Sequence, residues 1–395
     1  MLFQTLDIKN QCVGYYLNDS FIYSQPLGEL TRTWDYSPAL RDLDIEYARI
    51  YCGGKTLTEM CPERYQNMWT QTKERLSSYF KSFGTAKINL DDVCFFELVP
   101  EQFLFEFCDI KNEITKSVFA QKTRPPNYRL FANIIKLLGD IRRQPLNINI
   151  GAIRHKGGST AGRNFINRLQ KVRRVCDYNP WGTITGRLAT NPNSFPIMTM
   201  KKEFRGCLEP QNDWFVELDY NAAEVRTLLA LSDQEQPADD IHEWNMKNIY
   251  TDITDRDTAK QKIFAWLYSR RSNKRAEQFY NKELVLQKYW KNGTVMTEFD
   301  REITNVDAHH ALNYIVQSTT SDLVLSRAVE INEKLRSLAT NLSFTLHDSI
   351  ILDLKNEDRY IIPELIRTFA NTKFGKYKVN VAAGKNFGEM KGINL

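Results

Sequence analysis

The stretch FVELDYNAAEVRTLLAL, residues 215–231, decides the fold of this chain. Residues 215–218 are typical of a short buried strand. The following residues, 222–231, favour a helix that presents Val225, Leu228 and Leu229 on one side. Asp219 therefore stands where a strand ends and the chain turns. A single aspartate in such a place is also compatible with an ordinary turn.

A second aspartate occupies a similar place further along the chain. In FTLHDSIILDL, residues 344–354, Asp348 lies between two apolar runs. Carboxylates at strand ends can converge without interrupting a sheet. Two of them can hold a pair of divalent metal ions. Taken alone, Asp348 is again compatible with a turn.

Between the two aspartates lies DRDTAKQKIFAWLYS, residues 255–269. Four residues recur at intervals of four, which advances about 400° around a helix, so they share one broad face. They are Arg256, Lys260, Phe264 and Tyr268. Cations followed by aromatic rings suit a nucleotide that lies along the helix, with phosphates on the cations and the base on the rings. An ordinary amphipathic helix with Ile263, Phe264 and Leu267 packed is the alternative.

The order of these segments closely resembles motifs A, B and C of the family A DNA polymerases: DYNAAEVR from Asp219, R-x3-K-x3-F-x3-Y from Arg256, and HDS from His347. Other segments are similar to the family's in the same order. They are TGRLATNPN (185–193), DIH (240–242), ALNYIVQSTTSD (311–322) and VNVAAGKNFGEM from Val379. The resemblance runs from about residue 176 to the end of the sequence. Each motif is weak alone, but their shared order is specific.

The resemblance implies a role for each matching residue. Asp219 and Asp348 would hold two Mg²⁺ ions, which take oxygen ligands. Glu224 would lie beneath the sugar, where a ribose 2′-hydroxyl would clash with it. The residues implied to bind the dNTP are Arg256, Lys260, Phe264 (at the sugar), Tyr268 (at the templating base), His242 and Glu224. Those implied to touch the primer-template are Arg187, Asn193, Asn313, Gln317 and His347; outside the motifs, Asn313 and Gln317 would be helix-surface amides.

The chain departs from the family pattern at several positions. Ser349 stands where a glutamate commonly follows the motif C aspartate, so a supporting metal ligand is missing there. Ser269 stands where a glycine usually follows the motif B tyrosine. Asn221 and Ala222 replace a Ser-Gln pair. The intervals between motifs are short, which predicts reduced fingers.

Composition agrees with a nucleic-acid partner. The net charge of this 395-residue chain is only +5, but basic residues cluster at 168–174, 201–205 and 270–275. Such clusters suit a phosphate backbone and salt-sensitive binding, although each is also compatible with solvated surface. The seven cysteines lack C-x2-C spacing, which argues against a disulfide framework or a zinc site and for a reducing compartment. No secretory signal or membrane-length apolar run is present, so a cytoplasmic location without membrane contact is expected, in the host if the protein is phage-encoded.

The first part of the chain, up to residue 143, shows strand-like and helix-like patterns of apolar residues. Residues 11–18, 20–24 and 47–54 suggest strands, whereas residues 64–83, 100–120 and 127–143 suggest helices. Asp44 and Glu46, with Asp42 beside them, have the D-x-E spacing of an exonuclease site. Lys9 breaks the same pattern after Asp7. A charged strand edge is the favoured interpretation, because the long nuclease fold has no room before the helices.

We therefore expect an α+β chain with a right-hand polymerase fold: an antiparallel-sheet palm, reduced helical fingers, a helical thumb and a small β-rich N-terminal module. The expected ranges are 1–57 for the module, which is not a nuclease, 58–175 for the thumb, 176–239 and 306–395 for the palm and 240–305 for the fingers. The expected activity is primer extension with dNTPs, without proofreading. Expected partners are primer-template DNA, dNTPs and a separate exonuclease or processivity factor. The alternatives are a single-subunit RNA polymerase and a non-catalytic nucleic-acid-binding relative.

Overall fold

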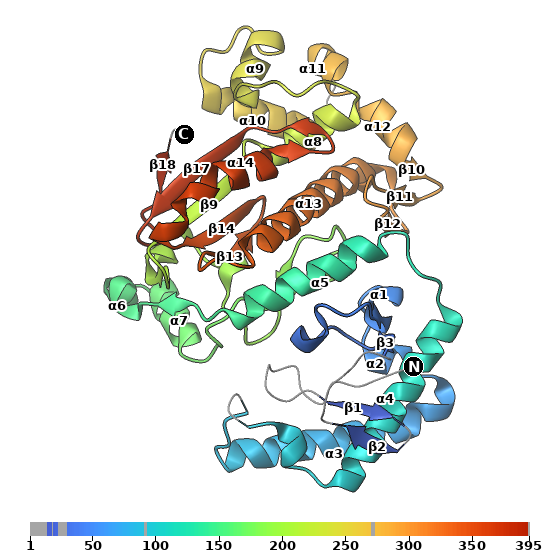
Figure 1. Cartoon of the computed structure of the whole chain (residues 1–395). Coiled ribbons are helices and arrows are strands. Elements are labelled where there is room, and N and C mark those ends of the chain that lie inside the picture. The colour runs from blue at the N-terminus through green and yellow to red at the C-terminus, as the bar shows by residue number, and fades with distance from the viewer. Residues whose placement is uncertain (1–13, 18, 23–29, 91–92, 270–272, 394–395) are drawn as a thin grey trace. The chain divides into compact units, whose positions relative to one another are not determined.

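The computed structural model describes residues 14–17, 19–22, 30–90, 93–269 and 273–393. Helices and strands are mixed along the chain (Figure 1). The chain divides into two compact units, Met1–Asp140 and Ile141–Leu395. None of the described helices combines the length and the apolarity that crossing a bilayer requires.

The longest described helices of the first unit are α3 (Gln66–Thr85), α4 (Glu101–Gln121) and α5 (Tyr128–Arg143), whose last residues belong to the second unit. They confirm the three predicted helical runs. A cluster that includes Phe83, Phe96 and Phe103 is buried between α3 and the start of α4. Burial of such aromatic side chains is a main source of stability for the packing of two helices.

The strands of the first unit are short. β1 (Tyr15–Leu17) pairs antiparallel with β2 (Ser20–Ile22), and β3 (Arg32–Thr33) pairs parallel with β4 (Glu46–Tyr47). The predicted strand over residues 47–54 is wrong after Tyr47, because Ala48–Tyr51 form the helix α1. Ala48 packs with Ile110 and Ile114 of α4, so tertiary packing outweighs local strand preference there. A further short helix, α2, spans Leu57–Met60.

Asp7 lies outside the described residues, whereas the D-x-E pair Asp44 and Glu46 is described. Glu46 accepts a hydrogen bond from Arg32 Nε at 3.2 Å and one from the Tyr51 hydroxyl at 2.5 Å. Its carboxylate is therefore engaged in an ion pair at a strand edge, whereas Asp44 is exposed.

The cysteines show one departure from expectation. Cys94 is disulfide-bonded, although the sequence predicted no disulfide framework. The free cysteines among the described residues are all buried: Cys52, Cys61, Cys108, Cys176 and Cys207.

An antiparallel five-stranded sheet forms the centre of the second unit. Its strand order is β13–β14–β9–β17–β18, so β9 lies in the middle (Figure 1). The predicted strand at 215–218 is confirmed, and the segment VNVAAGKNFGEM begins with the strand β17. The bounds are β9 (Trp214–Tyr220), β13 (Asn341–Leu346), β14 (Ser349–Leu354), β17 (Val379–Gly384) and β18 (Lys391–Ile393).

Helices cover one face of this sheet. They are α13 (Ala308–Leu335) and α14 (Ile362–Ala370). The Tyr220 ring stacks on Phe369 of α14 with centroids 4.1 Å apart, and its hydroxyl donates to the Phe369 carbonyl at 2.6 Å. Because side chains alternate along a strand, Glu217 and Asp219 of β9 point to the opposite face.

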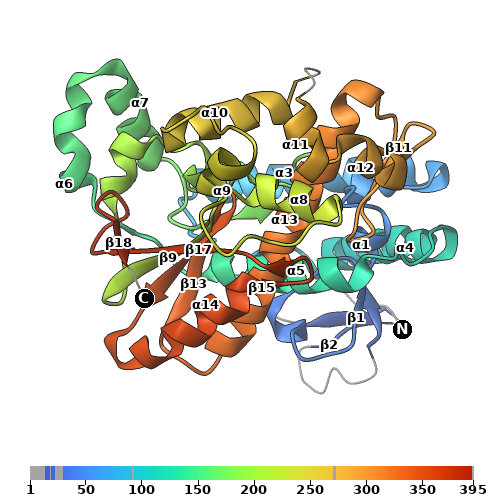
Figure 2. The same ribbon diagram turned by 90° about the horizontal axis from the view of Figure 1, so that it is seen from above.

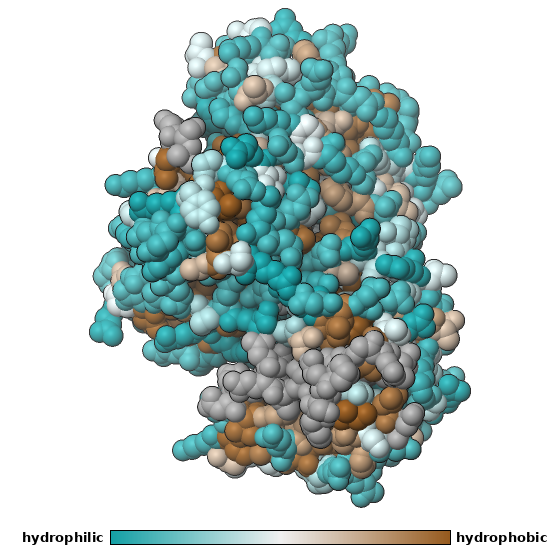
Figure 3. All heavy atoms as spheres, viewed as in Figure 1, coloured by the Kyte–Doolittle hydropathy of each residue, from teal (hydrophilic) through white to brown (hydrophobic). Residues whose placement is uncertain are grey.

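Further helices pack beside the sheet in the second unit, and α9 and α10 lie next to each other (Figure 2). They share an apolar cluster with α8 that includes Leu228, Ile241 and Ile263. The face in Figure 3 is mainly hydrophilic over this unit. The bounds are α8 (Ala223–Leu231), α9 (Ile241–Asn248), α10 (Arg256–Leu267), α11 (Lys274–Phe279), α12 (Lys282–Tyr289), β10 (Trp290–Lys291), β11 (Thr294–Met296) and β12 (Glu302–Ile303).

Short elements complete the second unit. Two strand pairs, β5 with β8 and β6 with β7, precede the central strand β9, and β15 pairs with β16 after α14. Their bounds are β5 (Asn147–Ile148), α6 (Ile150–Ile153), α7 (Thr160–Leu169), β6 (Tyr178–Asn179), β7 (Ala189–Thr190), β8 (Leu208–Glu209), β15 (Asn371–Thr372) and β16 (Gly375–Lys376).

A buried ion pair fixes the segment before Arg187. Arg301 donates to both carboxylate oxygens of Asp322, at 2.9 and 2.7 Å, and Asp322 is fully buried. Gly186 has a φ of +75° and lies so close that an added Cβ would overlap the Arg301 guanidinium. Ser321 Oγ donates to the Gly186 carbonyl at 2.9 Å. The turn at Gly186 therefore requires glycine for both its backbone conformation and its close approach to Arg301.

Breaking this ion pair should destabilise the protein. Asp322→Ala removes the carboxylate that compensates the Arg301 charge, and we expect the free energy of unfolding to fall by about 3–5 kcal/mol. Urea denaturation measures the change. The double variant Arg301→Met/Asp322→Leu should recover most of the loss, because it removes both charges and fills the space. Equal losses in the single and double variants would contradict a charge-based explanation.

Candidate active site

The structure brings Asp219 and Asp348 to the same end of the sheet. Ser349, the first residue of β14, pairs directly with Asp219 of β9. Asp348 precedes Ser349 in the two-residue turn between β13 and β14, where His347 has a φ of 55°. Pairing of adjacent strands thus places side by side two residues that are far apart in the sequence.

The two carboxylates share a site where negative charge is costly. Burial raises the pKa of Asp219 to about 7, together with the charges of Asp348 and Glu217, while the Asn380 amide at 3.4 Å and Lys260 oppose the rise. Burial also raises the pKa of Asp348, and Arg187 and Lys260 are among the groups that oppose it. Such a site favours a bound cation, which would offset both the cost of burying the charged carboxylates and their mutual repulsion.

The donor chemistry of this pair fits divalent ions. Carboxylate oxygens are the ligands that Mg²⁺ prefers, and Mg²⁺ commonly uses one or two of them together with substrate phosphates and water. Among the described residues, no group of three His, Cys, Asp or Glu side chains gathers closely enough to hold a metal ion.

Helix α10 presents the predicted row of side chains. Lys260 is exposed, Tyr268 is 42% exposed just after the helix, and Phe264 is half-buried. The Phe264 and Tyr268 rings stack at 6.5 Å with an interplanar angle of 18°. Ile263 and Leu267 are buried on the other side. The helix is thus amphipathic, as the alternative interpretation holds, and its accessible face carries a cation followed by rings. The Lys260 charge acts on both Asp219 and Asp348.

Arg256 is held by a residue to which the sequence analysis assigned no role. Its Nη2 donates to Asp240 Oδ2 at 2.7 Å, and Asn221 Nδ2 donates to the same oxygen at 2.7 Å. Burial opposes the charge of Asp240, but the hydrogen bonds from Arg256 and Asn221 outweigh it and hold the pKa of Asp240 well below its usual value. Asp240 also accepts from the backbone N–H groups of His242 and Glu243, at 2.9 and 3.1 Å. An aspartate just before a helix is an N-cap signal that could have identified it.

Asn221, just before α8, and Arg226 within α8 support this arrangement. Arg226 is fully buried and donates to the carbonyl oxygens of Asn221, Pro237 and Asp239, at 2.9, 2.8 and 2.6 Å. Asn221 Oδ1 accepts from the Ile241 backbone at 2.9 Å. The asparagine that departs from the family pattern therefore connects the end of β9 to the start of α9. A buried arginine that binds carbonyl groups leaves no periodic signal in the sequence.

His242 lies behind the accessible face. It is only 1% exposed, and its ring centre lies 6.1 Å from that of Phe264. Burial lowers the pKa of His242 to about 4, against the charge of Asp240 and together with those of Arg256 and Lys260. Its Nδ1 has no hydrogen-bond partner within the described residues. A neutral imidazole here could bind a phosphate by hydrogen bonding, so its assistance to the triphosphate stays a prediction.

Glu224 connects three parts of the site. From the first turn of α8 it accepts hydrogen bonds from the Arg187 guanidinium and from the Tyr268 hydroxyl. Burial raises the pKa of Glu224, although Arg187 opposes the rise. The residue implied to select the sugar thus lies next to the residue implied to face the templating base.

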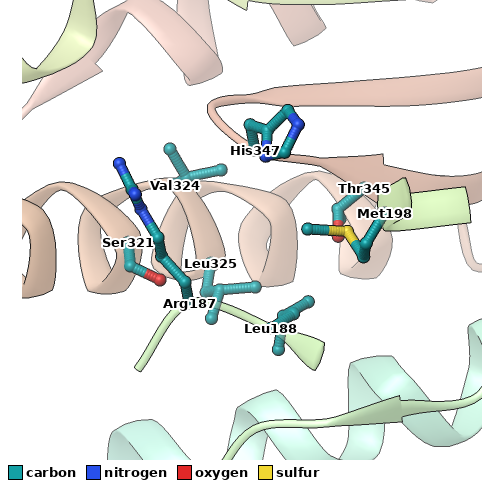
Figure 4. Close-up of a pocket in the computed structure, with 8 residues that line it drawn as sticks. All are labelled: Arg187, Leu188, Met198, Ser321, Val324, Leu325, Thr345 and His347. Carbon is teal, nitrogen blue, oxygen red and sulfur yellow. The ribbon is translucent and has the colours of Figure 1, made fainter. Parts of the chain in front are cut away.

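Two of the residues predicted to touch the primer-template, Arg187 and His347, lie close to each other. Arg187 and His347 line one small cavity of about 20 Å³, sufficient for about one water molecule (Figure 4). Asn313 and Gln317 lie one turn apart on α13 and are half-buried. Asn193 is exposed in the turn after β7, with a φ of 65°.

The basic clusters are exposed where the structure describes them. Lys201 and Lys202 are exposed, and the Arg205 guanidinium lies 4.7 Å from the centre of the Phe387 ring. In the cluster at 168–174, four basic side chains are exposed: Arg168, Lys171, Arg173 and Arg174. Residues 270–272 of the third cluster lie outside the described residues.

Comparison with known proteins finds a structural likeness but no match by sequence. No protein-family model and no curated protein sequence matches this chain. Among solved structures, it is similar to the POL domain of Pol1 from M. smegmatis, in complex with DNA primer-template and dNTP. The identity is 12%, the match covers 76% of this chain and 79% of that chain, and the TM-score is 0.58.

The chain has a polymerase-like fold. The matched share is larger than the second unit alone, so the likeness extends into residues before Ile141. At this level of identity the likeness shows the fold, and the roles of individual residues depend on the geometry of this chain.

Proposed function

We propose that this protein is a template-directed DNA polymerase that extends a primer 3′-hydroxyl with dNTPs. One observation carries the proposal. The pairing of β9 with β14 places Asp219 and Asp348 at one end of the sheet, and the charge of Lys260 on α10 acts on both carboxylates. Phosphoryl transfer requires groups that hold metal ions and groups that stabilise phosphate charge. The two carboxylates at the end of the sheet can do the first, and Lys260 on the accessible face of α10 can do the second.

In this proposal the side chains divide the work. Asp219 and Asp348 would hold two Mg²⁺ ions, which when bound would lower the pKa of the primer hydroxyl and stabilise charge at the α-phosphate. Lys260 and Arg256 would bind the triphosphate, and Asp240 fixes the Arg256 guanidinium in place. A positioned fork and a positioned point charge stabilise phosphate charge without reorganisation in the transition state.

The aromatic residues would define the base and sugar positions. Phe264 would pack against the sugar and Tyr268 would lie near the templating base, which accords with their stacked rings at the end of α10. The duplex and the primer end would meet Arg187, Asn193, Asn313, Gln317 and His347. Binding of a phosphate backbone by these residues and by the exposed basic clusters would weaken as salt increases.

The domain layout is part of the proposal. The palm would comprise residues 176–239 and 306–395, the fingers 240–305 and the thumb 58–175, with the front module at 1–57. The five-stranded sheet, the helices α9–α12, and the helices α3–α5 support these three parts in turn. The ordered motifs favour a short enzyme of family A, of phage or mobile-element type. It would lack proofreading and would rely on a separate exonuclease or processivity factor.

Sugar selection is one consequence that can be measured. Glu224→Ala should remove the group that would clash with a ribose 2′-hydroxyl, so we expect discrimination between dNTP and rNTP to fall at least about tenfold, or ~1.4 kcal/mol. The ratio of kcat/KM for a matched dNTP and rNTP measures it. Glu243→Ala, at an exposed glutamate of α9, is the control. An unchanged ratio in Glu224→Ala would contradict the assigned position of the sugar.

The direct test of the proposed function is extension of a labelled primer-template in Mg²⁺ with each dNTP and each rNTP. Extension with dNTPs alone supports the proposal. Extension that prefers rNTPs would support a single-subunit RNA polymerase instead. Shortening of a mismatched 3′ end would contradict the absence of proofreading, and loss of that activity in Glu46→Ala would assign it to the front module.

A second candidate is a non-catalytic nucleic-acid-binding relative of the same fold. One observation favours it: Ser349 stands at the position after Asp348, where the family commonly has a glutamate. Salt-sensitive binding of a primer-template without any extension would support this candidate.

A further inference from the structure

Glu217 lies on the same face of the sheet as Asp219. The burial pattern of β9 alternates at its C-terminal end, so that Glu217 and Asp219 are partly exposed while Leu218 and Tyr220 are buried. Glu217 pairs with Ile351 on β14, and Asp219 pairs with Ser349. Glu217 and Ser349 are therefore diagonal neighbours on one face, a distance that a long side chain can span.

The two side chains are joined. Ser349 Oγ lies 3.0 Å from Glu217 Oε1 and 3.0 Å from the Leu346 carbonyl oxygen. A hydroxyl carries one proton and can donate to only one of them at a time. A charged carboxylate accepts the stronger hydrogen bond, so an ionised Glu217 orients the Ser349 hydroxyl beside Asp219. Ser349 is nearly fully buried, which holds this geometry in place.

The charge of Glu217 adds to that of the aspartates. Its carboxylate is among the causes that raise the pKa of Asp219. Within the described residues, no lysine or arginine forms an ion pair with Glu217, Asp219 or Asp348. Three carboxylates at one end of a sheet repel one another, and the charges of Lys260 and Arg187 offset only part of that repulsion and of the cost of burial. Such an arrangement costs stability unless a cation binds near it.

We propose that Glu217 is a positioning residue of this active site, which holds the Ser349 hydroxyl and adds negative charge beside Asp219 to support a cation held there. The inference rests on the proposed function. It also gives a role to the serine that follows Asp348, because the Ser349 hydroxyl binds a carboxylate supplied by β9. Groups that orient metal ligands in this way commonly change metal affinity or activity by about 10–100-fold when removed.

Metal binding and primer extension test the inference together. Glu217→Gln keeps the shape of the side chain but removes its charge. We expect its affinity for Mn²⁺, measured by calorimetry on the full chain, to fall by about tenfold or more, and the Mg²⁺ concentration for half-maximal extension to rise in parallel. Glu302→Gln, at an exposed glutamate of β12, should change neither quantity. Thermal unfolding of each variant verifies that it is folded.

A relocated carboxylate provides the decisive variant. Ser349→Glu in the Glu217→Gln background returns one acid to the same face, directly opposite Asp219, and should restore most of the Mn²⁺ affinity. Glu217→Asp, which keeps the charge on a shorter side chain, should be intermediate between wild type and Glu217→Gln.

Three outcomes separate the inference from the proposed function. Unchanged Mn²⁺ affinity in Glu217→Gln, with affinity lost in Asp219→Asn, would overturn the inference and leave the function intact. Mn²⁺ affinity could instead be weakened in Glu217→Gln and stay equally weak both in Glu217→Asp and when Ser349→Glu is added to Glu217→Gln. That result would assign Glu217 a structural role and would also overturn the inference. A wild-type protein that binds Mn²⁺ through Glu217 but extends no primer would instead overturn the proposed function.

Discussion

Asp219→Asn is expected to abolish primer extension, with a loss of at least about 10³-fold in kcat, or ~4 kcal/mol. The substitution preserves shape but removes one of the two anionic ligands proposed for the metal pair. Asp348→Asn should have the same effect, because both carboxylates lie at one end of the sheet. Single-turnover extension in Mg²⁺ measures the loss.

Controls separate chemistry from folding and binding. Duplex binding by Asp219→Asn should stay close to that of the wild type, since the DNA contacts are assigned to other residues. Asp252→Asn, at an exposed aspartate between α9 and α10, should retain activity, and Ser349→Ala should lose far less than either aspartate variant. Near-normal turnover in Asp219→Asn would show that the catalytic site lies elsewhere.

Lys260→Ala is expected to lower kcat/KM for dNTP by about 10²–10³-fold, the usual consequence of removing one positioned group that stabilises developing charge. Lys260 is exposed on α10, and its charge acts on both aspartates. Arg256→Ala should lose less, because Asp240 already compensates part of its charge.

The helix offers a matched control for this prediction. Lys262 is also exposed on α10 but lies about 200° around the helix from Lys260. Lys262→Ala should therefore leave kcat/KM nearly unchanged, whereas duplex affinity should be similar in both variants. Equal losses of kcat/KM in the two lysine variants would mean that the effect comes from the overall charge of the helix. That result would contradict a nucleotide-binding role for the face that carries Lys260.

Much of the fold followed from local patterns. The strand at β9, the helix at α10 and the long helices α3, α4 and α5 were all predicted, because alternation and helical periodicity are properties of neighbouring residues. The predicted strand after Tyr47 was wrong, since a short apolar run is compatible with either structure until its packing partner is known. There, residues 48–51 form the helix α1, and Ala48 packs with Ile110 and Ile114 of α4.

Local spacing and the order of motifs were sufficient to predict which side chains could take part in chemistry. The order of motifs placed Asp219 and Asp348 at strand ends and put Arg256, Lys260, Phe264 and Tyr268 on one helical face, because spacing alone fixes direction within a strand or helix. These inferences needed no knowledge of distant contacts.

The contacts that support those side chains are visible only in the folded chain. The hydrogen bonds from Arg256 to Asp240, from Ser349 to Glu217 and from Arg301 to Asp322 join residues that are 16, 132 and 21 positions apart. Strand register and helix packing determine which residues of these pairs meet. Because the pairs are at least partly buried, their polar groups need hydrogen-bond partners within the protein. Such pairings have no period along the chain, so they become visible only when the chain is folded.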